Sequence, residues 1–120
     1  TRVAPYSRRV LESVSVPRIH FGTGAGHLLE AMAECGSEAI GIDHRIPLDE
    51  AARRLPGKVL QGNIDPARLA AGWENLVTHT KDVVERGRSA PAHVVNLGHG
   101  VPPETDPVVL TDLVSLVHEL

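Results

Sequence analysis

Three segments of the chain combine glycine or proline with side chains that can exchange hydrogen bonds with a ligand. They span residues 43–47, 61–66 and 96–100, and each follows a short apolar run. The first supplies a carboxylate at Asp43, the second a carboxamide at Asn63 and the third an imidazole at His99. Gly98 and Gly100 flank His99 and leave the backbone open around it, so its ring can donate a hydrogen bond to an acidic ligand.

A glycine-rich turn, Gly22-Thr23-Gly24-Ala25-Gly26, separates another apolar run from a helical pattern, and Asp43 follows Gly22 by 21 residues. This arrangement is similar to the Gly-x-Gly-x-Gly turn of S-adenosylmethionine-dependent methyltransferases, in which glycines admit the cofactor and an acidic side chain holds a ribose. The same glycines also suit a tight strand-to-helix turn, because such loops often need a conformation that glycine adopts readily. The turn by itself leaves both interpretations open.

Four short apolar runs predict buried strands, and helical periodicity follows each of them. The expected strands span residues 16–21, 39–43, 58–61 and 93–97, with one further helix before the first. Asp-Pro pairs at 65–66 and 106–107 mark helix starts, and the longer helix in the first region is expected to run through Trp73 and stop just before Gly87. This alternation predicts an α/β fold with parallel strands. Polar loops after several strands favour a (β/α)8 barrel, whose site is built at the carboxyl ends of many strands.

Composition restricts the classes of partner. The formal net charge is −3 and no basic stripe is present, which argues against nucleic acid. The one cysteine, Cys35, rules out an internal disulfide and a cysteine-based zinc cluster, and its apolar helical surroundings predict a packing thiol. No apolar stretch reaches the roughly 18 residues of a membrane span, and no signal peptide is recognisable, so we expect a cytoplasmic protein.

The loop sequences, taken together, resemble one family. Residues 61–66 (Gln-Gly-Asn-Ile-Asp-Pro), 96–100 (Asn-Leu-Gly-His-Gly) and 103–107 (Pro-Glu-Thr-Asp-Pro) are similar to the C-terminal signature of the uroporphyrinogen decarboxylases. The same order and spacing hold upstream for Pro5-Tyr6, Gly26-His27 and Gly41-Ile42-Asp43. The chain departs from the family at His44, where tryptophan is usual, and this leaves open how the rim is packed there.

This resemblance implies a (β/α)8 barrel that decarboxylates the four acetate side chains of uroporphyrinogen III. The product would be coproporphyrinogen III, in haem biosynthesis, formed without a metal or organic cofactor. The resemblance assigns substrate binding to His99 alone. Asp43, Asn63, Gly98 and Gly100 are possible site-lining residues by their positions, although Asp43 at a strand end is more typical of a structural role and Asn63 of a turn. The family's catalytic aspartate, its arginine-rich loop, and a tyrosine and a serine that contact substrate lie upstream of the matched segment. No catalytic residue is therefore expected within residues 1–120.

Residues 1–120 are thus expected to form the C-terminal half of the barrel, its last four βα units, as a fragment that is inactive alone. Its exposed edges predict a homo-oligomer in which two halves pair. Related corrinoid methyltransferases bind zinc through a His-x-Cys pair, but Gly22 stands two residues after His20, so no metal is expected. Two alternatives stay open: a Rossmann domain like that of the S-adenosylmethionine-dependent methyltransferases, and a non-catalytic chain that completes a barrel with another protein.

Overall fold

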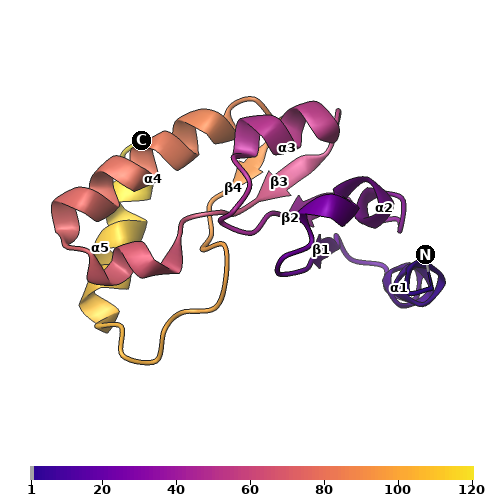
Figure 1. Ribbon diagram of the computed structural model, residues 1–120, viewed down its shortest axis with the longest axis horizontal. Coiled ribbons are helices and arrows are strands. Elements are labelled where there is room, and N and C mark those ends of the chain that lie inside the picture. The colour runs from indigo at the N-terminus through magenta and orange to yellow at the C-terminus, as the bar shows by residue number, and fades with distance from the viewer. Residues whose placement is uncertain (1) are drawn as a thin grey trace.

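A computed structural model describes residues 2–120 and contains one four-stranded parallel sheet, in which the spatial order of the strands equals their order in the chain (Figure 1). The strands are β1 (Ile19–Phe21), β2 (Ala39–Gly41), β3 (Val59–Gln61) and β4 (His93–Val94). The helical segments are α1 (Ala4–Glu12), η1 (Gly26–Leu28), α2 (Leu29–Ala33), α3 (Leu48–Arg54), η2 (Pro66–Ala70), α4 (Trp73–Gly87) and α5 (Pro107–His118). The predicted α/β fold, with helical crossovers between parallel neighbours, is confirmed.

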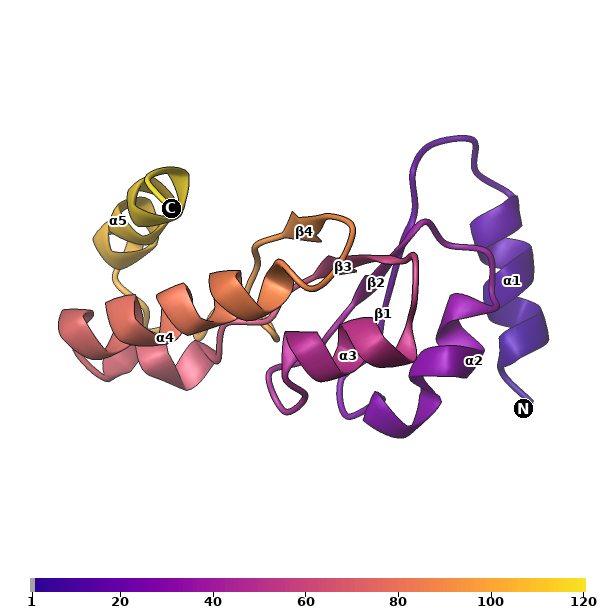
Figure 2. The same ribbon diagram turned by 90° about the horizontal axis from the view of Figure 1, so that it is seen from above.

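The two faces of the sheet differ in what covers them. Ile40 and Leu60 have no exposed surface and belong to an aliphatic core shared with α2, α3 and α4. Figure 2 shows these three helices along one side of the strands, with α1 and α5 at the two ends. On the opposite face, Ile19, Phe21 and Val94 remain 45–46% exposed. One face of the sheet is therefore a packed core, and the other is an uncovered apolar surface.

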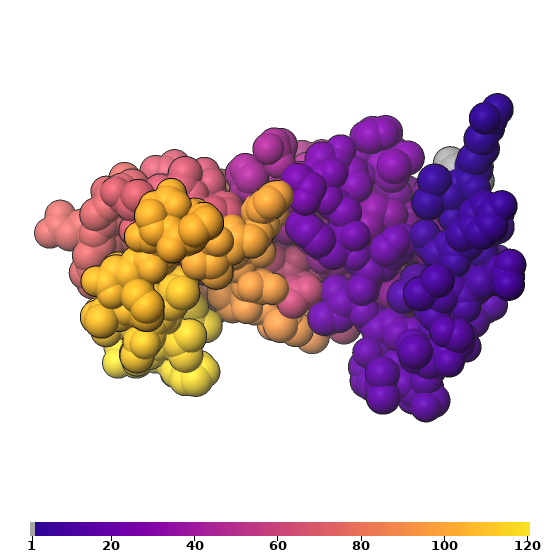
Figure 3. Space-filling model, turned by 90° about the horizontal axis from the view of Figure 1, so that it is seen from below, coloured from indigo at the N-terminus to yellow at the C-terminus, as the bar shows by residue number. Residues whose placement is uncertain are grey.

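The molecule is elongated because each βα unit is added beside the one before it. Its extents are 42 × 29 × 26 Å, and the N-terminal and C-terminal helices occupy opposite ends of the long dimension (Figure 3). Strands β1 and β4 form the two edges, and each pairs with one neighbour only among residues 2–120. In the part of the chain that the structure describes, no helix combines the length and apolar character needed to cross a bilayer.

The strands are shorter than the apolar runs that predicted them. Residues 16–18 precede the ladder, and after β4 a single bridge between Ile64 and Leu97 continues the pairing. Apolar character thus marks buried backbone in general, whereas a strand requires a neighbour in register. The expectation that Cys35 packs is confirmed, since its side chain is 2% exposed and its Sγ lies 3.3 Å from the Ala31 carbonyl oxygen.

The prediction of one continuous helix from Pro66 to the residue before Gly87 is wrong, because the structure has two separate helical segments there. Asp65 caps η2 by accepting a hydrogen bond from the Ala67 amide at 3.0 Å, but Gly72 has a φ of +88° and interrupts the helical path. Because a residue with positive φ cannot continue a right-handed helix, α4 begins anew at Trp73. Gly87 is the last residue of α4 and not the one after it.

Candidate functional site

The carboxyl ends of β1, β2 and β3 and the loop after β4 surround a cavity of about 260 Å³. It opens on the uncovered face of the sheet, at the carboxyl ends of the strands. The lining residues are Phe21, Gly41, Ile42, Gln61, Asn96, Leu97, His99 and Gly100. The strand register explains the grouping, because Phe21 pairs with Gly41 and Gly41 with Gln61, so their side-chain positions share one face. This is the place where barrel enzymes assemble their sites.

His99 lines this cavity and is exposed, as expected of a residue that contacts a ligand. Its Nδ1 accepts a hydrogen bond from the Gly100 amide at 2.7 Å. Because an acceptor nitrogen carries no proton, the proton of the neutral ring lies on Nε2. The Gly100 backbone thereby prepares His99 as an Nε2–H donor, which is the chemistry needed to bind a carboxylate.

Asp43 is buried beside the cavity, and its carboxylate already accepts hydrogen bonds from other residues of the chain. Its carboxylate is 5% exposed and accepts hydrogen bonds from the Arg45 amide at 2.8 Å, the Arg45 guanidinium at 3.1 Å and the Gly24 amide at 2.5 Å. Burial raises the pKa of Asp43, but these hydrogen bonds outweigh it and lower the pKa below its ordinary value. Asp43 is thus a charged anchor that holds two loops, which agrees with the structural role of a strand-end carboxylate.

The same contacts decide how the glycine-rich turn is used. Gly24, with a φ of +65°, points its amide at Asp43, and a Cβ added to Gly26 would lie 2.1 Å from the Ile46 side chain. The turn therefore packs on the loop after β2. It does not present its amides around an open cofactor cradle, and the tight-turn interpretation is the one that fits.

Asn63 ties the loop after β3 to the loop after β2. Its side chain is 4% exposed, and Nδ2 donates to the carbonyl oxygens of Asp43 at 2.9 Å and Ile46 at 2.6 Å. Asn63 is therefore placed within the loop scaffold, below the surface that a ligand would contact. It supports the site without lining the cavity.

Gly98 brings the loop after β4 against the same segment. It is buried, and a Cβ added there would lie 2.4 Å from the backbone nitrogen of His44. At this rim, where the family usually has tryptophan, the packing is made by the main chains of residues 44 and 98. The Cβ of His44 belongs to the same contact, since it would lie 2.8 Å from the Cβ added at Gly98. Residues 43–46 thus contact the loops after all three other strands, and they place His99 through Gly98.

Of the site residues named from the sequence, His99 and Gly100 line the cavity. Six lining residues were not named as site residues: Phe21, Gly41, Ile42, Gln61, Asn96 and Leu97. The signal for Phe21 and Gln61 was the period of two along a strand. Each residue ends its strand on the face opposite to Ile40 and Leu60, which are wholly buried.

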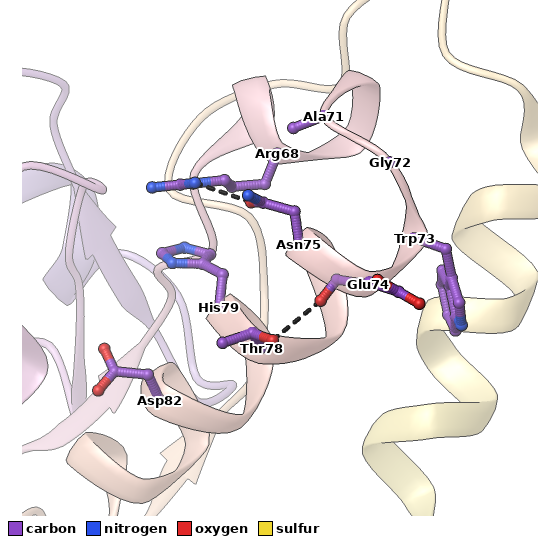
Figure 4. Close-up of a pocket in the computed structure, with 9 residues that line it drawn as sticks. All are labelled: Arg68, Ala71, Gly72, Trp73, Glu74, Asn75, Thr78, His79 and Asp82. Atoms are coloured by element: carbon purple, nitrogen blue, oxygen red, sulfur yellow. Dashed lines mark hydrogen bonds between the residues drawn. The ribbon is translucent and has the colours of Figure 1, made fainter.

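A larger open hollow of about 700 Å³ lies elsewhere, between η2 and the first half of α4 (Figure 4). Its polar groups largely satisfy each other. Arg68 donates to Asn75 Oδ1 at 2.7 Å, and the Nε2 of His79 accepts from the Asp65 amide at 3.0 Å. Burial, together with the nearby Arg68 charge, lowers the pKa of His79. This hollow shares no residue with the cavity around His99.

The fold and the placement of the cavity define this chain as four βα units of a (β/α)8 barrel protein. A solved methyltransferase from Methanosarcina mazei has the same fold, with a TM-score of 0.85 at 20% identity over 98% of this chain and 35% of that one. At this identity the similarity concerns the fold alone.

The sequence profile of the family "Uroporphyrinogen decarboxylase (URO-D)" matches residues 1–120. The uroporphyrinogen decarboxylase of Leifsonia xyli subsp. xyli is 67% identical over 105 residues, which cover 87% of this chain and 28% of that protein. That of Arthrobacter sp. is 57% identical over 122 residues, covering 98% and 35%. The chain belongs to the uroporphyrinogen decarboxylase family, and it spans about a third of the length of these relatives.

Proposed function

We propose that residues 1–120 form the last four βα units of a uroporphyrinogen decarboxylase and supply the His99 side of its substrate site. The observation that supports this most directly is the Nε2–H of His99, which is set as a donor at a cavity at the carboxyl ends of the strands. Uroporphyrinogen III carries acidic side chains, and a carboxylate is the group that such a donor binds best.

In the proposed reaction, the bond between an acetate methylene and its carboxyl group breaks, CO2 leaves, and a proton takes its place on the methylene carbon. A protonated pyrrole ring accepts the electron pair, so the protein need only position the substrate and stabilise charge. Asp43 is buried and fully engaged, which makes it unsuitable as the anionic group that faces the pyrroles. We therefore assign the catalytic carboxylate to the other part of the barrel and propose that the 120-residue chain alone is inactive. We also place the protein in the cytoplasm, which the free, buried Cys35 fits.

A chimaera tests this proposal. The Leifsonia xyli relative is rebuilt with this chain in place of its matching segment, and conversion of uroporphyrinogen III to coproporphyrinogen III is followed. The chimaera is expected to be active and the isolated chain inactive. An inactive chimaera that is folded by circular dichroism would contradict the proposal, and so would turnover by the isolated chain.

Within this chimaera, His99→Leu is expected to raise the KM for uroporphyrinogen III by about tenfold or more, because it removes a hydrogen bond to a charged group. His99→Gln keeps an N–H donor and should recover part of that loss. Steady-state kinetics of the three proteins provide the measurement. An unchanged KM in His99→Leu would show that the ring does not contact substrate.

We further propose that the isolated chain pairs with a second copy through its uncovered sheet face and edges. Ile19, Phe21 and Val94 on that face are almost half exposed, and Tyr6 and Val10 on α1 are 67% and 68% exposed. Apolar surface and unpaired strand edges of this kind favour association. Light scattering should give a mass above 12.9 kDa, and Val94→Lys at the β4 edge should shift it toward the monomer. A monomer at every concentration would contradict pairing.

A further inference from the structure

We propose that Gln61 is a second substrate-binding residue of the cavity and that its side-chain amide donates a hydrogen bond to an acidic arm of the substrate. This inference rests on the proposed function and extends it, because it assigns a specific contact to a residue on the floor of the same cavity. Gln61 is the last residue of β3, and it lines the cavity together with His99.

The first step is the direction of the Gln61 side chain. Leu60, its neighbour in β3, is wholly buried in the core between sheet and helices. Because successive side chains of a strand point to opposite faces, Gln61 belongs to the uncovered face. It pairs with Gly41 on one side and Val94 on the other, so the row that contains it is otherwise apolar.

The second step is that the Gln61 carboxamide does not hold the fold together through hydrogen bonds. Its side chain makes no hydrogen bond within residues 2–120. The two neighbouring carboxamides do make them: Asn63 donates to two carbonyl oxygens, and Asn96 accepts from the Leu97 amide at 2.8 Å. A carboxamide on an apolar face loses its water when that face is covered, at a cost that is offset only by a new hydrogen-bond partner. A ligand with polar arms provides that partner.

The third step is the shape of the floor beside Gln61. The Phe21 side chain lies over Gly41, and a Cβ added at Gly41 would stand 2.8 Å from Phe21 atoms. Glycine at this position lets the aromatic ring lie across β2 next to Gln61. A ring that rests on Phe21 can therefore place one acidic arm at Gln61 and another at the Nε2–H of His99. This arrangement fits a ring-bearing ligand with carboxylate arms.

Two substitutions of similar length separate donation from packing in the active chimaera. Gln61→Met keeps the bulk and removes the donor, and it is expected to raise the KM for uroporphyrinogen III about tenfold with the thermal midpoint nearly unchanged. Gln61→Glu replaces the donor by a negative charge, and it should raise the KM further by repelling the carboxylate. Val59→Thr is the matched control, since Val59 lies on the same face of β3 but outside the cavity, and its KM should stay within about twofold.

The outcomes distinguish this inference from the function on which it rests. Loss of activity in the unsubstituted chimaera would contradict the proposed function and would say nothing specific of Gln61. If that chimaera turns over and Gln61→Met keeps its KM, the Gln61 contact is wrong. A Gln61→Glu protein that binds substrate better than Gln61→Met would also overturn it, because the carboxamide would then be an acceptor and not a donor. Since Glu and Gln have nearly the same shape, a Gln61→Glu protein with the KM of the parent would overturn it even if Gln61→Met folds poorly.

Discussion

Replacing Asn63 by Asp is expected to lower the free energy of unfolding by about 3–5 kcal/mol, the range for leaving a buried charge uncompensated. The Nδ2 of Asn63 donates to the carbonyl oxygens of Asp43 and Ile46, at 2.9 and 2.6 Å, from a side chain that is 4% exposed. An ionised carboxylate has no hydrogen to donate, so Asp at this position would set a negative charge against two carbonyl oxygens. It would also add a charge close to the Asp43 carboxylate.

Urea unfolding of the chimaera at neutral pH measures this effect, and Asn96→Asp serves as the matched control. Asn96 is exposed and uses its Oδ1 only as an acceptor for the Leu97 amide, a role that a carboxylate keeps. The control should therefore change stability by no more than about 0.5 kcal/mol. Burial next to acceptors raises the pKa of the carboxyl group introduced at position 63. The difference in the free energy of unfolding between the Asn63→Asp protein and the parent should therefore narrow as the pH falls. If Asn63→Asp and Asn96→Asp lowered the free energy of unfolding by the same amount, the assigned role of Asn63 would be contradicted.

The sequence predicted the α/β fold because the alternation of apolar runs and helical periodicity repeats four times. It failed where one residue sets the backbone direction. Gly72 lies in a stretch whose apolar spacing is compatible with a helix, and only its φ of +88° separates η2 from α4. Such a φ depends on the packing of the two segments against each other. Local sequence therefore does not determine it, since glycine occupies both halves of the Ramachandran plot.

The candidate site was predictable in its residue types but not in how they are used. Asp43 and the glycine-rich turn were both conspicuous, and a cofactor site and a tight turn were both compatible with them. The contact between the Gly24 amide and the Asp43 carboxylate decides between them, and it joins residues that are 19 positions apart. Gln61 was overlooked because it stood inside a motif that was read as a whole. The face of the strand on which Gln61 lies became clear only from the burial of Leu60.

The two glycines that flank His99 are expected to respond very differently to the same added methyl group. Gly98→Ala should destabilise the protein by about 3 kcal/mol, because the new Cβ would lie 2.4 Å from the His44 nitrogen and 2.8 Å from its Cα. Both atoms belong to the backbone and cannot rotate away. The loops after β2 and β4 would have to separate, which moves His99, so the KM of the chimaera should rise together with the loss of stability.

Gly100→Ala is the matched control, since no atom lies within 4 Å of a Cβ built there. The Gly100 amide still donates to His99 Nδ1 in this variant, so the free energy of unfolding should stay within about 0.5 kcal/mol of that of the parent. Urea unfolding and steady-state kinetics on the pair provide the comparison. If Gly98→Ala were as well tolerated as Gly100→Ala, the loop after β4 would not rest on residue 44. The placement of His99 through Gly98 would then be wrong, because a loop free to accept the methyl group could not hold the imidazole in a fixed position.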